Sequence, residues 1–484
     1  MTLMKSLLLG SAAALVTVAA AQAADLPTKK GAPAAEYVKI CKINGVAGFV
    51  IPGSDTCLKI SGGVFAMASV GNLDKGYVPV APVASAASVS LNASAGQASA
   101  ASVNSLAAKW SLAATKYRDD FGEYARADLG LEAVSNTAYG PLTSVIDIHW
   151  DQGYGMNQAG PNWTYINEAY IQWAGITAGV KPSFYDYLGG GETWFNMISP
   201  EHTGTGIPLF AYTATFGGSF SATISAEENT DATTGRPTIA VGPETFFGYG
   251  ANTYLGAQAP DIVGSLDLTQ SWGMVHLAGV AHNYRLEDAW GYDNTGWGWG
   301  GILGVGFNVP QLGAGDVIKL QGAYSYAAVG YSGFTTAGWG CGASAGCGDN
   351  GVNANGNGYL YTFADAVGDN HGAWSYPSTW EFAAVAELHL TPQFEIAPEI
   401  SYGQISWSNR SAYGDFFALE GNAWSWLGGA AFTWTPATNL SFNIDIVYQS
   451  THWDAPANPV IAQYYYPAGN ASGFNGRFKI ERDF

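Results

Sequence analysis

The sequence predicts an all-β fold, a 16-stranded antiparallel transmembrane β-barrel with short periplasmic turns and long extracellular loops. Three observations support this prediction: polar and apolar residues alternate along many segments, short turns alternate with long connections, and the chain ends in an alternating stretch with an aromatic last residue. Alternation with a period of two is typical of strands whose two faces meet different surroundings. An even number of up-and-down strands returns the last strand beside the first, which closes a barrel.

The first 23 residues have the features of an export signal. Lys5 precedes an uninterrupted run of apolar and small residues that closes in Ala21-Gln22-Ala23, which matches the three regions of a secretory signal peptide. A transmembrane helix is disfavoured because the run is short and no basic stop-transfer cluster follows. We therefore expect a signal peptide over 1–23, an N-terminal segment over 24–57 and the barrel over 58–484.

The composition favours strands and argues against a nucleic-acid partner. Charged residues make up only 12% of the chain, whereas 63 residues are Gly, 17 are Trp and 27 are Tyr. This balance suits many strands and glycine-rich loops. The formal net charge of -19 becomes -20 when Lys5 leaves with the signal peptide, so the protein would repel nucleic acid.

The four cysteines form two local pairs, Cys41 with Cys57 and Cys341 with Cys347. Short spacings in an exported chain predict two disulfides, one in a hairpin before the first barrel strand and one in a surface loop. Zinc is the competing interpretation, and it is disfavoured because the pairs are far apart and lack nearby His. We expect neither a metal nor a cofactor.

Two hairpins near the C-terminus give the clearest template for the strands. Apolar residues share one face over 380–390 and over 424–434, a short turn follows each segment, and the alternation resumes at 394 and 440. The template predicts sixteen strands, at 58–70, 104–117, 121–134, 164–173, 176–181, 209–216, 219–227, 260–268, 273–283, 298–309, 316–327, 380–389, 394–405, 424–434, 440–450 and 474–484.

The connections between these strands differ in length in a regular way. Short turns are predicted at 118–120, 174–175, 217–218, 269–272, 310–315, 391–393 and 435–439, and they alternate with long loops at 71–103, 135–163, 182–208, 228–259, 284–297, 328–379, 406–423 and 451–473. The Ala/Ser-rich stretch within 71–103 and the Gly- and aromatic-rich stretches 291–306 and 330–358 are predicted to be exposed loops. All short turns would then lie at one end of the barrel.

The last strand indicates which face of the sheet meets lipid. Phe478, Ile480 and Phe484 share one face, and the residues between them are charged. An aromatic final residue on an amphipathic closing strand is the signal that outer-membrane assembly machinery is understood to recognise. Aromatic residues also stand at strand ends, where membrane barrels place their interfacial girdles. We therefore expect the apolar face to lie outside, in contact with outer-membrane lipid.

Several motifs resemble the alphaproteobacterial general porin family: EYVKICKINGVAGFVIPGSDTCLKISGGV, NEAYIQWAGITAGVKPSFYDY, PDIVGSLDLTQSWGMVHLAGVAHN, GAGDVIKLQGAYSYA and the terminal GRFKIERDF. The resemblance implies a homotrimer of sixteen-stranded outer-membrane barrels through which small hydrophilic solutes diffuse passively. It also implies a third long loop, here 182–208, folded inward to constrict the pore. Lys181 departs from the pattern, since the family more often has Arg there, and basic residues are sparse.

The candidate site is the pore lining, because such a channel has no catalytic residues. The inward loop supplies Asp186, Glu192 and Glu201. On the predicted strand 121–134, alternation places Tyr124, Arg126, Asp128 and Glu132 on the inner face, since Ala125, Ala127, Leu129 and Leu131 suit the lipid face. Acidic residues number 38 and basic residues 18 without Lys5, which predicts a pore that favours cations.

Two other functions fit parts of the sequence. An outer-membrane barrel hydrolase would need Ser, His and an acid or amide on one wall; His149, His276, His282 and His389 are present, but no G-x-S-x-G motif accompanies them. A secreted, soluble carbohydrate-binding β protein would instead use its Trp residues as core or as stacking platforms. Neither has a motif of its own, so we expect a channel and not an enzyme.

Overall fold

The computed structural model describes residues 39–71, 77–79, 112–114, 121–155, 163–189, 198, 200, 206–228, 253–256, 258–287, 291–333, 365–368, 372–407, 422–454 and 469–484. The predicted signal peptide, the predicted Cys341–Cys347 pair and the candidate residues Glu192 and Glu201 lie outside these ranges.

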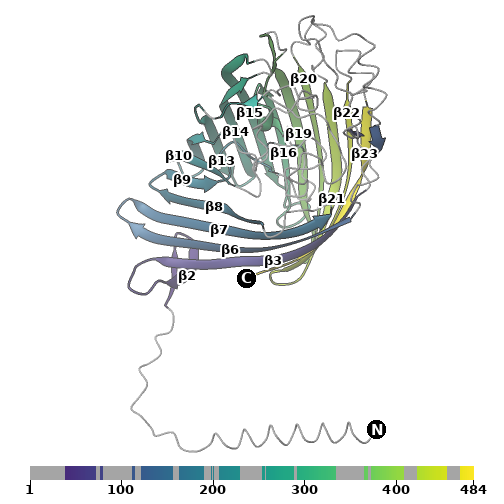
Figure 1. Cartoon of the computed structure of the whole chain (residues 1–484). Helices are drawn as coiled ribbons and strands as arrows, with labels where there is room; N and C mark the ends of the chain where they lie inside the picture. The colour runs from purple at the N-terminus through teal and green to yellow at the C-terminus, as the bar shows by residue number, and fades with distance from the viewer. Residues whose placement is uncertain are drawn as a thin grey trace, which may run out of the picture.

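Sixteen antiparallel strands form one closed barrel (Figure 1). In chain order they are β3 (Cys57–Gly71), β6 (Phe121–Thr137), β7 (Gly140–Gly155), β8 (Trp163–Trp173), β9 (Ile176–Lys181), β10 (Ile207–Phe216), β11 (Phe220–Glu227), β13 (Asp261–Gln270), β14 (Gly273–Glu287), β15 (Asp293–Asn308), β16 (Val317–Tyr326), β19 (Pro377–Thr391), β20 (Phe394–Trp407), β21 (Ala423–Ala437), β22 (Leu440–Trp453) and β23 (Gly469–Asp483). The barrel closes where β23 pairs with β3, from Asn475 opposite Gly71 to Asp483 opposite Gly63. The backbone N–H of Phe484 extends this seam by donating to the carbonyl of Gly62 at 2.9 Å.

Smaller elements accompany the barrel. They are the hairpin β1 (Ile40–Ile43) and β2 (Val46–Val50), the pair β4 (Tyr77–Pro79) and β5 (Leu112–Ala114), β12 (Thr253–Tyr254), the pair β17 (Val367–Gly368) and β18 (Trp374–Ser375), and the 3-10 helix η1 (Val329–Ser332). The predicted Cys41–Cys57 disulfide is confirmed, with Cα atoms 5.7 Å apart, and it ties the β1–β2 hairpin to the start of β3. No helix in the described residues is long and apolar enough to cross a membrane.

The predicted strand number is correct, but one of the sixteen assignments is wrong. The described part of the predicted strand 104–117 is not in the barrel: Leu112–Ala114 pairs with Tyr77–Pro79 in a separate two-stranded sheet, and β3 pairs directly with β6. The sixteenth strand is β7, which occupies most of the predicted long loop 135–163. The two errors compensate, because one predicted strand is lost and one predicted loop contains a strand.

The predicted long loop 284–297 is also too long, because the strands on both sides extend into it. Residues 293–297 belong to β15, although the stretch 291–306 is rich in Gly and aromatics, and β14 continues to Glu287. Beyond the apolar belt both faces of a strand meet polar surroundings, so the alternation that predicts the strand fades while the backbone ladder continues. The ladder between β14 and β15 extends as far as Glu287 opposite Asp293.

Two of the short turns lie at their predicted positions and contain residues with positive φ. Ala174 and Gly175 (φ 52° and 87°) join β8 to β9, and Gly217 and Gly218 (φ 60° and 79°) join β10 to β11. Two central residues with positive φ are the mark of the two-residue hairpin turn whose twist matches that of the strands. Because β8 and β10 run in the same direction in the antiparallel sheet, these two turns lie at the same end of the barrel.

The barrel has a polar interior and an apolar exterior. On β20, Glu399 is 5% exposed, Ile400 is 52% exposed and Ser401 is fully buried. The same alternation runs round the wall: exposed apolar side chains include Val64, Ile146, Phe210, Leu277, Leu303, Phe382, Ile444 and Phe478, and buried polar ones include Asp151, Glu227, Asp261, His276, Gln321, Glu381, Asp445 and Arg477. A soluble sheet protein has the opposite arrangement, whereas an apolar outer belt around a polar lumen is the arrangement of a membrane barrel.

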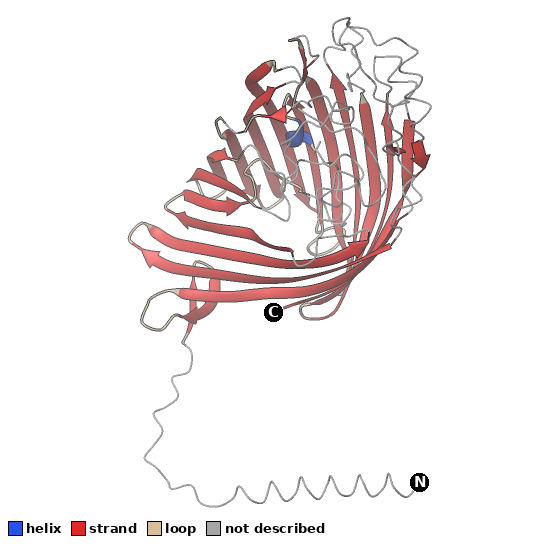
Figure 2. Ribbon diagram, viewed as in Figure 1, coloured by secondary structure: helices blue, strands red, loops and turns tan. Residues whose placement is uncertain are grey.

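The helix η1 is held against the inner wall by a buried charged cluster. Figure 2 shows this helix in front of the strands. His282 of β14 has its Nδ1 2.8 Å from Oδ2 of Asp261 and its Nε2 3.1 Å from Oδ2 of Asp365. The backbone N–H of Val329 donates to Oδ1 of Asp365 at 2.9 Å. His282 is therefore a structural link between the wall and the chain that follows β16.

Candidate functional site

A network of polar side chains surrounds Arg126 on the inner face of β6. Its Nε and Nη2 donate to the two carboxylate oxygens of Asp151 on β7, at 2.8 and 3.0 Å. Nη2 also donates to the hydroxyls of Tyr124 at 2.9 Å and Tyr165 at 2.7 Å. The side chain of Asp151 is fully buried and that of Arg126 is 14% exposed. This two-point ion pair compensates the charge of Arg126 at the wall.

The network continues along β7 and β8. His149 Nδ1 lies 3.0 Å from the hydroxyl of Tyr165, and its Nε2 lies 3.1 Å from Oδ2 of Asp147. Asn167 donates to the same oxygen of Asp147 at 2.8 Å. His149 is therefore part of the polar lining and links neighbouring strands.

Three other basic side chains of the described inner wall are also in ion pairs. The ion pairs are Arg126 with Asp151, Lys319 with Glu387, Arg477 with Asp445, and Lys479 with Glu481. The ammonium of Lys479 in addition lies 5.4 Å from the ring centroid of Phe65. Because each of these cations has a carboxylate partner, their positive charge is largely compensated.

A cavity on the inner wall near the short-turn end is lined by carboxylates. Its lining includes Asp128 and Glu132 from β6, Asp147 from β7, Glu168 from β8 and Asp483 from β23. Carboxylates gathered beside low-dielectric walls focus a negative potential that attracts cations. Two basic residues border this lining: Lys59 of β3 lies opposite Glu132 in the ladder, and the ammonium of Lys181 lies 4.6 Å from the ring centroid of Tyr170.

The connection after β9 begins by crossing the inner face of β11 and β14. The hydroxyl of Ser183 and the backbone N–H of Phe184 both donate to the carboxylate of Glu227, the second at 3.1 Å. His276 of β14 has its Nε2 3.1 Å from the backbone carbonyl of Tyr185. Its Nδ1 lies 2.7 Å from Oδ1 of Asp267. These bonds tie the chain to the wall at its first turn.

The same connection reaches strands on a further part of the wall. The backbone N–H of Leu188 donates to Oε1 of Gln321 on β16 at 2.9 Å. The backbone N–H of Ile198 donates to Oγ of Ser401 on β20 at 2.9 Å. The segment therefore contacts inward-facing side chains from β11 to β20.

Two tyrosines of this segment are packed against the wall and stay neutral. Tyr185 is fully buried, in a cluster with Val263, Ile302 and Tyr331. Burial raises the pKa of Tyr185 well above its ordinary value, and burial together with the charge of Glu387 raises the pKa of Tyr187 to about 12. Asp186 is the acidic residue of the described stretch 182–189.

The structure places the predicted site residues as follows. Tyr124, Arg126, Asp128 and Lys181 lie on the inner face, and Asp186 lies in the inward segment. Tyr124 is only 3% exposed, because its ring stacks on Phe65 with centroids 5.6 Å apart. It supports Arg126 and presents little surface to the lumen.

Sequence reasoning missed several polar residues of the lining, notably Asp147, Asp151 and Glu168. The first two lie on β7, which was predicted to be a loop. A signal was available, because Leu142, Ile146, Ile148, Trp150 and Tyr154 occupy even positions opposite them. Gly140-Pro141 at the start and acids on the inner face masked this alternation.

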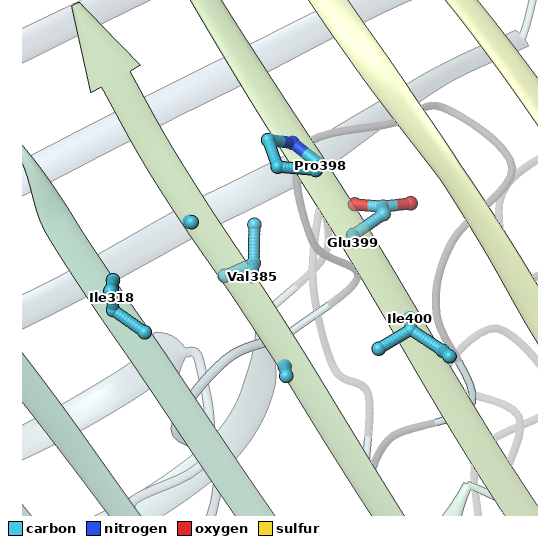
Figure 3. A pocket seen from close by; sticks show the side chains of 7 residues that line it. Ile318, Val385, Pro398, Glu399 and Ile400 are labelled. Carbon is cyan, nitrogen blue, oxygen red and sulfur yellow. The ribbon is translucent and has the colours of Figure 1, made fainter.

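A shallow depression on the wall is not part of the site (Figure 3). It lies between β16, β19 and β20, where Pro398 cannot donate a hydrogen bond to the ladder and the pairing skips from Val385–Glu399 to Leu388–Ile396. Its lining is apolar apart from Glu399. It therefore lacks the few convergent polar groups that orient a small ligand.

Comparison with known proteins matches nearly the whole chain. The Porin subfamily model matches residues 25–471. Porin Omp2b of Brucella abortus is 27% identical over 443 residues, which cover 87% of this chain and 96% of that protein; porin Omp2b of Brucella canis is 28% identical over the same shares. The outer membrane channel DcaP of Acinetobacter baumannii shares the fold, with a TM-score of 0.58, 12% identity, and coverage of 91% of this chain and 100% of that one.

These findings confirm the family resemblance that the sequence motifs indicate. They also bear on the choice among a channel, a barrel hydrolase and a soluble carbohydrate-binding protein. The match extends over the polar inner wall and over the inward segment. Family membership indicates a channel rather than an enzyme, and the soluble carbohydrate-binding alternative is wrong because the apolar face lies outside. The chain belongs to the Porin subfamily and is a porin of the bacterial outer membrane.

Proposed function

We propose that this porin lets small hydrophilic solutes diffuse passively and favours cations over anions. The observation that carries the proposal is the uneven pairing of charges on the inner wall. Arg126, Lys319, Arg477 and Lys479 are all in ion pairs, whereas five carboxylates gather in one cavity. The surplus of negative charge along the lumen raises the local concentration of cations.

The proposed constriction is the connection 182–208. Its contacts with β11, β14, β16 and β20 support a position inside the barrel. Asp186 would then present a carboxylate to the permeation path, and we propose the same role for Glu192 and Glu201. A ring or cluster of acids at a narrow point selects for cations more strongly than acids at a wide mouth.

We also propose a homotrimer in outer-membrane lipid, assembled through the C-terminal strand. Family membership supports the trimer. Phe478 and Ile480 are exposed on the outer face, and Phe484 completes the seam with β3. These positions are accessible to assembly machinery before the barrel closes.

The test is the reversal potential of the purified protein in a planar bilayer under a KCl gradient. We expect a sign that indicates cation preference, and a smaller preference in the double variant Asp128→Asn/Asp147→Asn. Asp55→Asn is the matched control, because this exposed residue lies in the turn before β3 and is not in the lining of the carboxylate cavity. Anion preference of the unmodified protein would contradict the proposal.

A further inference from the structure

The inner face of β15 is almost bare of side chains. Even positions of this strand point inward and odd positions point outward, since Trp297, Trp299, Leu303 and Phe307 are all exposed. Between 296 and 306 the inward positions are Gly296, Gly298, Gly300, Gly304 and Gly306, with Ile302 as the exception. Glycine is unfavourable in a strand interior, and there it often marks a place that another group approaches closely.

At Gly300, Gly304 and Gly306 the groups that approach include tyrosines of the segment that follows β9. A Cβ added at Gly304 would lie 2.2 Å from Cδ1 of Tyr187, and one at Gly306 would lie 2.8 Å from its hydroxyl. A Cβ at Gly300 would lie 3.2 Å from the hydroxyl of Tyr185. The ring of Tyr187 therefore lies along the strand, directly on the backbone of β15.

The neighbouring strand fixes the same ring from the side. His276 of β14 is paired with Gly304 in the ladder. The imidazole stacks on the ring of Tyr187, with centroids 5.9 Å apart and planes 13° from parallel. His276 also contacts the carbonyl of Tyr185, so side chain and backbone of the segment are held by one cross-strand pair.

We propose that Gly300, Gly304 and Gly306 of β15, which we call the seat, determine the width of the channel. Because these residues have no side chain, Tyr187 and the segment that carries it can lie close to the wall. The proposal rests on the proposed constriction by 182–208. The hydrogen bonds to Glu227 and Gln321 determine where the segment runs along the wall. The glycines of β15 determine the distance between the segment and the wall. A larger residue in the seat would hold the segment farther into the lumen.

The size of this effect follows from contact distances. Carbon atoms approach to about 3.5 Å before repulsion sets in, and a Cβ at Gly304 would stand 2.2 Å from the ring. The ring must therefore move away from the wall, toward the lumen. Gly301 offers a matched control on the same strand, because it points outward and an added Cβ would meet its nearest atom, the carbonyl oxygen of Ala278, only at 3.6 Å.

The experiment compares single-channel conductance of Gly304→Val, Gly301→Val, Tyr187→Ala and the double variant Gly304→Val/Tyr187→Ala. We expect a loss of conductance in Gly304→Val, none in Gly301→Val, a gain in Tyr187→Ala, and recovery to at least the unmodified level in the double variant. Heat-modifiable mobility in SDS checks that each barrel is folded. If Gly304→Val does not assemble, Gly306→Ala replaces it, with the same expected loss.

The outcomes separate the seat from the constriction. If Tyr187→Ala raises conductance but Gly304→Val, or its replacement, behaves like Gly301→Val, the seat is refuted and the constriction stands. If Tyr187→Ala changes nothing, the segment does not limit permeation and both proposals fail. A loss in Gly304→Val that Tyr187→Ala does not reverse would also refute the seat, because the loss would then come from another part of the barrel.

Discussion

Arg126 shows how single residues of the inner wall combine structure with charge. Its guanidinium joins β6 to β7 through Asp151, and the surrounding rings of Phe65, Tyr124 and Tyr165 lie 5.5 to 5.8 Å from it. A strand-borne Arg must face either the lumen or lipid, and lipid costs about 2–4 kcal/mol at mid-depth. The aromatic and acidic neighbours explain why the side chain lies flat on the wall instead of projecting into the pore.

Asp151→Asn is expected to destabilise the barrel by about 3 kcal/mol, because it leaves a buried guanidinium without its carboxylate partner. Asp128→Asn removes the same charge from a partly exposed residue that has no such partner in the Arg126 network, so we expect a change below about 1 kcal/mol. Urea-induced unfolding of both variants in lipid vesicles measures the difference. Equal stabilities would show that the ion pair contributes little.

At the scale of a strand, β7 shows that neighbouring residues meet opposite surroundings. Ile146 is 44% exposed on the outer face. Its neighbour Val145 is only partly exposed and lies beside the carboxylates of the inner cavity. One position therefore separates hydrocarbon from a negatively charged lumen, which makes this pair a direct test of the alternation.

Ile146→Arg is expected to destabilise the barrel by about 2–4 kcal/mol, the cost of a basic side chain on the lipid face near mid-depth. Val145→Arg is expected to leave the barrel folded, because carboxylates surround the new guanidinium, and to reduce its cation preference. Unfolding in vesicles and the reversal potential distinguish the two outcomes. Similar destabilisation by both substitutions would contradict the assignment of faces.

The N-terminal hairpin is expected to depend on its disulfide while the barrel does not. The cross-link spans 16 residues, which corresponds to about 3 kcal/mol of loop-closure entropy. In Cys41→Ser/Cys57→Ser, limited proteolysis should cleave within 40–56 faster, and heat-modifiable mobility of the barrel should be unchanged. Loss of the folded barrel would show that the hairpin is required for closure.

The elements could be predicted from the sequence where one face meets lipid and the other meets water. Hairpins such as β21–β22 satisfy that condition and were predicted to within a few residues. β7 was missed because acids on its inner face resemble a loop, and 104–117 was assigned as a strand because small apolar residues resemble a weak one. The inner-wall ion pairs could not be predicted, since Arg126 and Asp151 are joined by register and not by spacing along the chain.

The whole molecule inverts the usual distribution of polar and apolar residues, and the channel follows from this inversion. Charged and amide side chains line the inside of the barrel, while aliphatic and aromatic side chains cover the outside. Closure by β23 and β3 removes free strand edges, which a bilayer does not tolerate. The proposed cation preference and the proposed seat on β15 both depend on this arrangement of faces.

Cysteine labelling along β7 tests the arrangement of faces most directly. The experiment uses a membrane-impermeant maleimide that is small enough to enter the pore. It is added to intact outer membranes that contain one of four variants, Val145→Cys, Ile146→Cys, Asp147→Cys or Ile148→Cys. We predict that positions 145 and 147 react from the water-filled lumen and that 146 and 148 are protected by lipid. Uniform labelling, or reaction at 146 and 148 with protection of 145 and 147, would contradict a polar lumen inside an apolar wall.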